Sequence, residues 1–333
     1  MLLKGLGEDR IIEGLKKRSG KRHPRLVMGI GDDTSVTRQK AGLVTLATVD
    51  TLIEGTHFDP KYTPPYLLGR KALSISVSDI AAMGGQPLFF LVSLALPEKT
   101  EKRFLDELYR GINDAAGEYD VVIAGGNIAR SVLTAVSTTV FGEAKEKEVV
   151  YRSGAREGDI IYVTGTPGDS ALGLKVLRNH GARALKGRFR KAAWKHLDPR
   201  ARIDAGRALA RRGLASAMID ISDGVALDLT RICKSSGKGA IIELEDFPIS
   251  DEMKKYREAA KDSSWIDLAL SGGEDYELLF TSPEPDRNKI ASLAKTLGLR
   301  ITAIGRITDK KGLKVLGKDK RLYRLKKAGF EHF

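Results

Sequence analysis

The amino-acid sequence predicts a mixed α/β protein, α+β in part, with two domains. Three observations support this prediction. The 333 residues are enough for two hydrophobic cores. Strand-like and helix-like segments alternate along the first half of the chain. A charged stretch, Glu143–Glu148, then precedes a second set of such segments. We therefore expect one domain over residues 1–145 and another over residues 146–333.

The first half contains segments of both kinds. Residues 42–49 are rich in β-branched and apolar side chains and predict a strand that ends at Asp50. Residues 67–83 carry apolar side chains at near-helical spacing and stop at two glycines, which predicts a helix. The apolar run from Pro87 to Pro97 predicts a fully buried strand. The same criteria predict a helix at residues 101–117 and strands at residues 119–124 and 132–141.

The second half repeats this mixture. Its turn Gly165–Ser170 resembles a phosphate-binding turn ahead of a helix, but lacks the Gly-Lys-Ser/Thr ending of a P-loop. Each half also holds a Gly-Gly-polar sequence that we interpret as a turn, Gly125–Asn127 and Gly272–Glu274. Either an old duplication or chance accounts for this echo. We expect strands at residues 159–164, 239–244 and 276–281, and helices at residues 170–178, 225–233 and 288–297.

The composition excludes several classes of protein. With 42% hydrophobic and 30% charged residues, it is typical of a soluble globular protein. The run from Pro87 to Pro97 is too short to cross a bilayer, which needs about 20 residues. The first residues break into charge too early for a secretory signal. The single cysteine, Cys233, cannot form an internal disulfide, which fits a reducing cytoplasm. We therefore expect a cytoplasmic protein with no membrane partner.

The formal net charge of +13 has two interpretations. The excess is concentrated in Arg178–Arg212 and Lys310–Lys327. It attracts nucleotides or nucleic acid, or it is a solvated, thermostable surface without a function. Because neither region contains a nucleic-acid-binding motif, we expect no nucleic-acid partner. A nucleic-acid-binding protein would lose affinity steeply as the salt concentration rises.

Six aspartates lie in short Gly- or Ser-flanked motifs spread over two thirds of the chain: Asp32, Asp33, Asp50, Asp79, Asp220 and Asp223. The last four have no Lys or Arg within three positions. A carboxylate beside apolar strand or helix residues is unfavourable unless a cation compensates it. Carboxylates suit Mg²⁺, which shares its remaining positions with water and phosphates. The pattern therefore favours phosphoryl chemistry with ATP.

Most of these motifs also have a simpler interpretation. Gly31–Thr34 is compatible with ordinary turn chemistry. Asp50 is compatible with a cap of the turn after its strand, and Asp223 with a helix N-cap. Asp79 is harder to explain in this way, because it lies inside an apolar helical stretch. His57 is either a ligand-binding residue or a buried core histidine.

Taken together, the motifs are more specific than any one of them. Their order resembles that of the thiamine-monophosphate kinase family, in the AIR synthase-like superfamily, over nearly the whole chain. The segments GTPGDS and SGGEDYEL and the ending GFEHF are particular to this family. The matching segments are GIGDD (29–33), VDTLIEGTHF (49–58), VSDIAAMG (77–84), GGN (125–127), YRSGAREGD (151–159), VTGTPGDSALGL (163–174), IDISDG (219–224), LSGGEDYELLFT (270–281) and GFEHF (329–333).

The resemblance implies direct transfer of the γ-phosphoryl group of ATP, the co-substrate, to the phosphate of thiamine monophosphate, which gives thiamine diphosphate. It implies several Mg²⁺ ions and no catalytic side chain, since this chemistry depends on positioning and charge stabilisation. The implied fold is AIR synthase-like. Its N-terminal domain binds ATP and Mg²⁺ and pairs its strands with a second subunit of a homodimer, and a C-terminal αβ domain follows.

The resemblance also assigns residues by matching position. Glu274 and Phe330 suit a cationic, aromatic acceptor through charge pairing and ring contact. The implied Mg²⁺ ligands are Asp33, Thr48, Asp50, Asp79, Asp220 and Asp223. The implied nucleotide contacts are Tyr109, Gly126, Asn127, Arg152 and Ser222. The implied contacts to thiamine monophosphate are His57, Glu274 and Phe330.

Two positions depart from the pattern of the family. Asn127 stands where the family usually has a metal-binding Asp. We keep Asn127 as a metal ligand, because an amide oxygen coordinates Mg²⁺, but it brings no negative charge and one ion should bind more weakly. Val49 replaces a hydroxyl residue, which matters less if the backbone oxygen is the ligand.

Several alternative functions compete with this interpretation. Selenophosphate synthetase needs a reactive residue near its N-terminus, and the hydrogenase-maturation relative needs a C-terminal cysteine; the only thiol here is Cys233. AIR synthase itself would not carry SGGEDYEL. A related ATP-dependent enzyme for another small phosphorylated acceptor and a non-catalytic nucleotide-binding regulator stay open.

Overall fold

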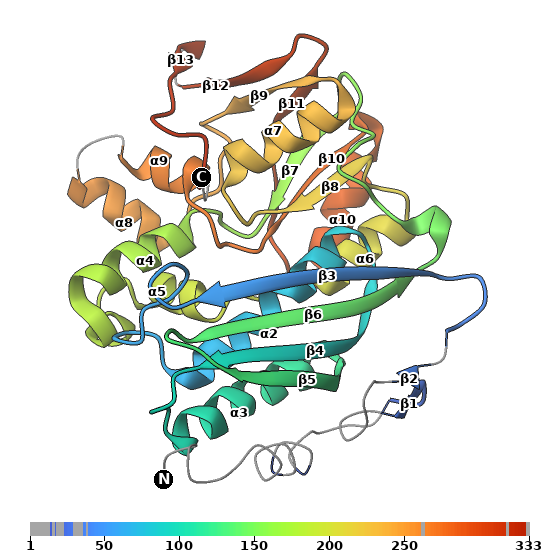
Figure 1. Ribbon diagram of the computed structural model, residues 1–333. Helices are drawn as coiled ribbons and strands as arrows, with labels where there is room; N and C mark the ends of the chain where they lie inside the picture. Colours follow the sequence, from blue (N-terminus) through green and yellow to red (C-terminus); the bar gives the residue numbers. More distant parts are fainter. Residues whose placement is uncertain are drawn as a thin grey trace. The chain divides into compact units, whose positions relative to one another are not determined.

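The computed structural model describes residues 39–260, 264–317 and 320–330, together with residues 14, 17, 23–28 and 36–37. The chain divides into two compact units. The first unit comprises residues 1–80 and 85–147, and the second comprises residues 81–84 and 148–333. Each unit combines a β-sheet with helices (Figure 1), as the sequence predicts.

The first unit is built on a four-stranded sheet in the order β3-β6-β4-β5. Strand β6 pairs antiparallel with both β3 and β4, and β4 pairs parallel with β5. The short strands β1 and β2 form a separate antiparallel pair. The bounds are β1 Leu26–Met28, β2 Val36–Thr37, β3 Val44–Ile53, β4 Gln86–Leu96, β5 Val122–Arg130 and β6 Ala135–Ala144.

Helices α2 (Pro65–Ala82) and α3 (Lys102–Tyr119) cover one face of this sheet (Figure 1). Burial alternates along β6, because successive side chains of a strand point to opposite faces. The hydroxyl of Thr138, on the buried face of β6, donates a hydrogen bond of 2.6 Å to the carbonyl oxygen of Ala72 in α2. Ser76 of α2 donates in return to the carbonyl oxygen of Thr138 at 3.1 Å. These bonds fix α2, which carries Asp79, against the sheet.

Two glycines allow α2 and α3 to pack at close range. A Cβ atom on Gly111 of α3 would lie 1.9 Å from the carbonyl oxygen of Tyr66, and one on Gly69 of α2 would lie 2.0 Å from that of Leu108. We expect Gly111→Ala to destabilise the protein by about 3 kcal/mol, because the helices must separate. Gly117→Ala in the same helix is the matched control, since a Cβ atom there meets no described atom within 4 Å. Thermal unfolding of both variants tests this, and equal melting temperatures would contradict it.

The second unit contains a seven-stranded mixed sheet in the order β13-β12-β9-β11-β7-β10-β8. Only β12 and β9 pair parallel; the other pairs of this sheet are antiparallel. The bounds are β7 Ile160–Thr164, β8 Ala217–Asp220, β9 Gly239–Glu243, β10 Leu278–Ser282, β11 Ile301–Thr308, β12 Gly312–Leu316 and β13 Leu322–Tyr323.

Helices cover both faces of this sheet, so its central strands are buried throughout. Strand β7 sends Ile161 into a core with α7 and α9, and Tyr162 into a core with α6 and α10. This explains why β7, β8 and β10 read as continuous apolar runs. The helix bounds are α4 Asp169–His180, α5 Arg190–Leu197, α6 Ile203–Arg211, α7 Val225–Ser236, α8 Asp251–Ala260, α9 Ser264–Ser271 and α10 Arg287–Leu297.

The strand predictions for the first half need three corrections. Strand β3 continues to Ile53, because its pairing with β6 extends to Ala135, so Asp50 lies inside the strand and not at its end. Strand β4 is not fully buried: helices cover one face only, and Ser93 is exposed. Residues 119–124 are not one strand, because α3 runs to Tyr119 and ends at Asp120, which has a left-handed conformation.

Strand β5 instead begins at Val122 and passes through Gly125–Asn127. That sequence is therefore a strand segment and not a turn, so the two Gly-Gly-polar sequences do not form matching turns. Strand β10 begins at Leu278, two residues later than predicted, because positive φ angles at Glu274 (64°) and Tyr276 (51°) interrupt the extended backbone. The other predicted helices and strands are confirmed to within three residues.

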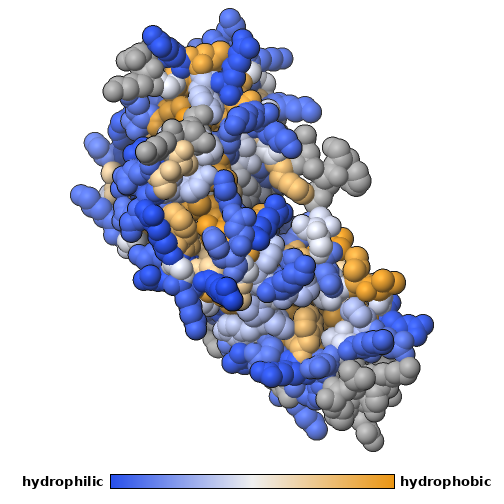
Figure 2. All heavy atoms as spheres, turned by 90° about the vertical axis from the view of Figure 1, so that its left-hand side faces the viewer, coloured by the Kyte–Doolittle hydropathy of each residue, from blue (hydrophilic) through white to orange (hydrophobic). Residues whose placement is uncertain are grey.

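The exposed side chains on one face of the molecule are mostly polar. Figure 2 shows a face dominated by hydrophilic side chains, with apolar side chains exposed in small groups. Across the described ranges, no helix combines the length and the apolar character that crossing a membrane requires.

Candidate active site

The first unit brings two of the predicted carboxylates together. Alternation along β3 places Thr48 and Asp50 on its half-buried face, and Asp79 comes from α2. The hydroxyl of Thr48 donates a hydrogen bond to Oδ2 of Asp79. Burial and then the charge of Asp79 raise the pKa of Asp50 to about 6, against a lowering effect of the Ser76 hydroxyl. The carboxylates of Asp50 and Asp79 and the hydroxyl of Thr48 therefore lie close together.

One oxygen of this group has no partner. Oδ2 of Asp50 is buried and, among the described residues, accepts no hydrogen bond. A buried carboxylate oxygen without a donor is unfavourable, and a bound cation would compensate it. The donor set is all oxygen, which fits Mg²⁺ rather than a softer metal. Within the described ranges, no three His, Cys, Asp or Glu side chains form a metal cluster. Ligands from substrate phosphates and water would complete such a site.

The second unit brings five other predicted residues together. Asp220 ends β8 and is buried, and the loop after it carries Ser222 and Asp223. The backbone N–H of Glu274 donates to the carbonyl oxygen of Ser222 at 2.7 Å, and that of Phe330 donates to the carbonyl oxygen of Asp223 at 3.0 Å. The loop 219–224, the loop 272–277 and the segment that carries Phe330 are therefore neighbours.

Asp223 has a compensating cation, which its neighbours in the sequence did not indicate. Its carboxylate is compensated by Arg231, eight positions later on α7, with Nη2 2.5 Å from Oδ2. A window of three residues cannot detect this pair. Arg231 also binds Asp228, whose Oδ2 accepts the backbone N–H groups of Asp223 and Gly224 at 3.1 Å each. The interpretation of Asp223 as an N-cap is also wrong, because Gly224 occupies that position without a side-chain cap.

Two N–H groups of the turn Gly165–Ser170 are bound by a side chain of the protein itself. The carboxylate of Asp275 accepts the N–H of Gly168 at 2.6 Å and the N–H of Ser170 at 3.0 Å. The side chain of an internal acid thus occupies the N-terminus of α4, where an external anion would otherwise bind. The turn serves to hold the loop 272–277 in place.

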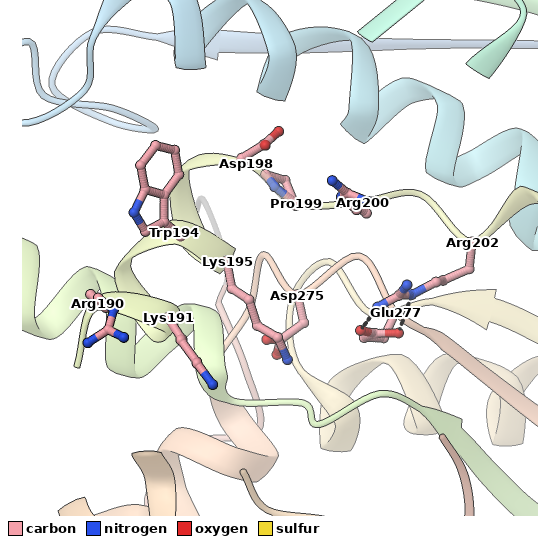
Figure 3. A pocket seen from close by; sticks show the side chains of 10 residues that line it. All are labelled: Arg190, Lys191, Trp194, Lys195, Asp198, Pro199, Arg200, Arg202, Asp275 and Glu277. Carbon is pink, nitrogen blue, oxygen red and sulfur yellow. Dashed lines mark hydrogen bonds and ion pairs between the residues drawn. The ribbon is translucent and has the colours of Figure 1, made fainter. Parts of the chain in front are cut away.

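A hollow of about 420 Å³ lies beside α5 in the second unit. Figure 3 shows Lys195 directed toward Asp275, and Arg202 paired with Glu277. Burial favours the neutral amine of Lys195, but the neighbouring Asp169 and Glu277 outweigh it and raise the pKa. Sequence reasoning missed Lys195 and Arg202, because their partners are 26 to 80 positions away in the chain, and no local pattern signals them.

The remaining predicted residues of the first unit that the structure describes are His57, Tyr109, Gly126 and Asn127. Nδ1 of His57 accepts the N–H of Ile53 at 3.1 Å, so the half-buried ring keeps its proton on Nε2. Tyr109 is only 5% exposed, and burial raises its pKa. Gly126 and Asn127 are exposed on β5, where a Cβ atom on Gly126 would meet the carbonyl oxygen of Val92 at 2.1 Å.

In the second unit, Arg152 is exposed, and Phe330 is 49% exposed. Asp33 falls outside the described residues, and of the ending GFEHF only Gly329 and Phe330 are described.

Comparison with known proteins decides which family this arrangement belongs to. The family model of the AIR synthase related protein N-terminal domain matches residues 31–144, and that of the C-terminal domain matches residues 156–318. The thiamine-monophosphate kinase of Salmonella typhimurium is 38% identical over 309 residues, which cover 92% of this chain and 91% of the relative. That of Aquifex aeolicus is 37% identical over 334 residues, which cover all of both. The chain belongs to the thiamine-monophosphate kinase family.

Solved structures of this family have the same fold. The thiamine-monophosphate kinase of Stenotrophomonas maltophilia K279a matches with a TM-score of 0.82 at 32% identity, over 94% of this chain and 96% of that one. AaThiL complexed with AMPPCP and TMP matches with a TM-score of 0.78 at 36% identity, over 100% and 99%. The hydrogenase maturation protein HypE in complex with ATP shares the fold with a TM-score of 0.77 at 18% identity, over 98% of both chains. The predicted resemblance and fold class are confirmed.

Proposed function

We infer that this protein is a thiamine-phosphate kinase, which transfers the γ-phosphoryl group of ATP to the phosphate of thiamine monophosphate. One observation carries this inference beyond family membership. Asp50 and Asp79 face each other with Thr48, and one buried carboxylate oxygen has no hydrogen-bond donor among the described residues. Such a group suits a reaction in which two anionic reactants must be brought together by cations.

Mg²⁺ is the cation that these oxygens fit. Asp50, Asp79 and Thr48 would hold one part of the metal assembly, and we propose Asp33, Asn127, Asp220 and Asp223 as further ligands of several ions. Bound Mg²⁺ neutralises phosphate oxygens and so permits the two reactants to approach. The residues of the chain supply position and charge, and no side chain acts as a nucleophile.

Other residues are proposed to bind the two reactants. Arg152 is exposed and offers a fork of donors to a phosphate of ATP; Tyr109, Gly126, Asn127 and Ser222 are the other proposed nucleotide contacts. Tyr109 is only 5% exposed, so little of its side chain is available for this role. His57, Glu274 and Phe330 are the proposed contacts to thiamine monophosphate. The exposed ring of Phe330 suits contact with an aromatic acceptor.

Asn127 provides a test of the metal assignment. Asn127→Asp adds a negative charge at an exposed position of β5, so we expect it to lower the Mg²⁺ concentration for half-maximal rate by about threefold to tenfold. Ser131→Asp, which adds the same charge just after β5, is the control. The measurement is the initial rate against free Mg²⁺. An unchanged Mg²⁺ requirement would place residue 127 away from the metal.

We also propose a cytoplasmic homodimer that pairs through the sheet of the first unit. Residues 1–145 would form the ATP- and Mg²⁺-binding and dimerisation domain, and residues 146–333 the second domain. The face of β3 turned away from the helices exposes Val49 at 62% and Ile53 at 37%. Exposed β-branched residues on a sheet face favour association with a second copy. Light scattering of Val49→Glu against the wild type tests this assignment.

The substrate assignment is tested by offering the protein ATP and Mg²⁺ with three acceptors in parallel: thiamine monophosphate, thiamine and an aminoimidazole precursor. We expect thiamine diphosphate from the first acceptor only. Turnover of another acceptor in place of thiamine monophosphate would overturn the assignment.

A further inference from the structure

Glu274, a proposed acceptor contact, is held in a strained loop. Its φ angle is +64°, and Gly272 and Gly273 precede it. A Cβ atom on Gly273 would lie 2.4 Å from the carbonyl oxygen of Ser222, so the loop is closely packed. A non-glycine residue in this conformation costs about 1–3 kcal/mol and persists only when its surroundings hold it there. The residues that contact Glu274 therefore stabilise this backbone conformation.

Helix α5 supports this loop from one side. Two consecutive residues of α5 face two consecutive acids of the loop. Figure 3 shows Lys195 directed toward Asp275, and the charge of Lys195 acts on that carboxylate. The next residue, His196, places Nδ1 3.6 Å from Oε2 of Glu274.

Helix α4 supports the loop from a second side. The N–H of Ser170 donates to Oδ1 of Asp275 at 3.0 Å. The hydroxyl of Ser170 lies 3.0 Å from Nδ1 of His196. Ser170 therefore contacts both His196 and Asp275. The loop is held at Asp275 by Ser170 and at Glu274 by His196.

The burial of the two side chains differs sharply. The side chain of His196 is 2% exposed, whereas that of Glu274 is 25% exposed. The histidine therefore contacts the acid from the interior, while the acid still reaches the surface. Nδ1 of His196 is within hydrogen-bond distance of the Ser170 hydroxyl, at 3.0 Å, and the carboxylate of Glu274 lies 3.6 Å from the same nitrogen, which is ion-pair distance. Such a contact limits the rotamers of Glu274.

We propose that His196 is a positioning residue for acceptor binding, which orients the carboxylate of Glu274 toward the cationic ring system of the acceptor. This inference rests on the proposed function. The contacts of His196 described above are with Ser170 and Glu274, neither of which is a proposed metal or nucleotide ligand. Its removal should therefore weaken binding of the acceptor and leave the chemical step and the binding of ATP nearly unchanged.

The test compares steady-state constants for three variants. We expect His196→Ala to raise KM for thiamine monophosphate by about tenfold, with kcat within about threefold and KM for ATP unchanged. His196→Asn should restore most of the loss, because its amide nitrogen can take the place of Nδ1. His180→Ala, an exposed position at the end of α4, is the matched control and should change nothing.

A double-mutant cycle with Glu274→Gln identifies the route of the effect. If His196 acts through Glu274, the two substitutions together raise KM by less than the product of their separate effects. Multiplying effects would overturn the inference, as would an unchanged KM for thiamine monophosphate in His196→Ala, or an equal rise in KM for ATP. If His196→Ala does not fold, His196→Asn is compared with His196→Gln, which lacks a nitrogen at the Nδ1 position; equal constants would then count against the inference.

The wild type is measured first, so that two failures can be told apart. A wild type that does not form thiamine diphosphate would overturn the proposed function and this inference together. A wild type that forms it, beside a His196→Ala variant with normal constants, would overturn this inference alone.

Discussion

Asp50→Asn is expected to slow phosphoryl transfer by about 10²- to 10³-fold at saturating ATP and thiamine monophosphate. This is the scale for the loss of one charge-stabilising group in an active site. Asp50 supplies the buried oxygen that has no donor among the described residues, beside Asp79. An amide in its place keeps the shape of the side chain and removes the charge that would hold Mg²⁺. Initial rates at several Mg²⁺ concentrations measure the loss.

The same substitution should stabilise the metal-free protein. The pKa of Asp50 is raised from 3.8 to about 6 in the folded state, so ionisation of Asp50 destabilises the fold. This penalty is absent below pH 4, grows between pH 4 and 6, and is complete above pH 6. We therefore expect Asp50→Asn to add about 1–3 kcal/mol of stability at pH 7.5 and little at pH 4. Added Mg²⁺ should stabilise the wild type more than the variant, which keeps the other proposed metal ligands.

Asp246→Asn provides the control, because Asp246 is exposed in the second unit and the change in charge is the same. It should alter neither the rate nor the melting temperature. If Asp50→Asn kept the wild-type rate and the wild-type response to Mg²⁺, Asp50 would not be a metal ligand.

Arg202→Met should lower the stability of the protein by about 3–5 kcal/mol, which is the usual loss when one partner of a buried ion pair is removed. Glu277 is 3% exposed. Burial alone would raise its pKa, but the hydrogen bonds and charge of Arg202 outweigh burial and lower it. Nε of Arg202 lies 2.7 Å from Oε2, and Thr164 donates to the same oxygen at 2.6 Å. Without Arg202, the carboxylate keeps only part of this compensation.

Thermal unfolding measures this effect, and a fall of roughly 10 °C corresponds to it for a unit of this size. Arg200→Met, two positions earlier and exposed, is the matched control and should be close to neutral. Because Arg202 holds the pKa of Glu277 down, its stabilising effect is present at neutral pH and is lost as Glu277 becomes protonated in acid. An Arg202→Met variant as stable as Arg200→Met would show that Arg202 is not needed to compensate Glu277.

Local sequence patterns were sufficient to predict the helices and strands that such patterns determine. The apolar spacing within α2 and α3 and the β-branched runs of β7 and β9 fixed those segments to within a few residues. Prediction failed where distant pairing decides the structure. Strand β3 extends past Asp50 because β6 continues beside it. The extended state of Gly125–Asn127 depends on its pairing with β4, which glycine-rich sequence does not indicate.

In the candidate site too, prediction succeeded where local sequence was informative and failed where distant residues meet. The aspartates stood out because apolar neighbours surround them in the sequence, and the structure places Asp50 beside Asp79. The cations that compensate other acids were not predictable, because Arg231 and Arg202 reach across 8 and 75 positions. The same holds for His196, whose contact with Glu274 joins helix α5 to a loop of the same unit. Only folding brings such pairs together.

The central claim is that the terminal phosphoryl group of ATP passes directly to thiamine monophosphate. The most direct measurement is a reaction with ATP labelled in its γ-phosphoryl group, followed through one turnover in the presence of Mg²⁺. We expect the label in the terminal phosphoryl group of thiamine diphosphate, with an equal amount of ADP. Label that appears as free phosphate, with no labelled thiamine diphosphate, would contradict the account.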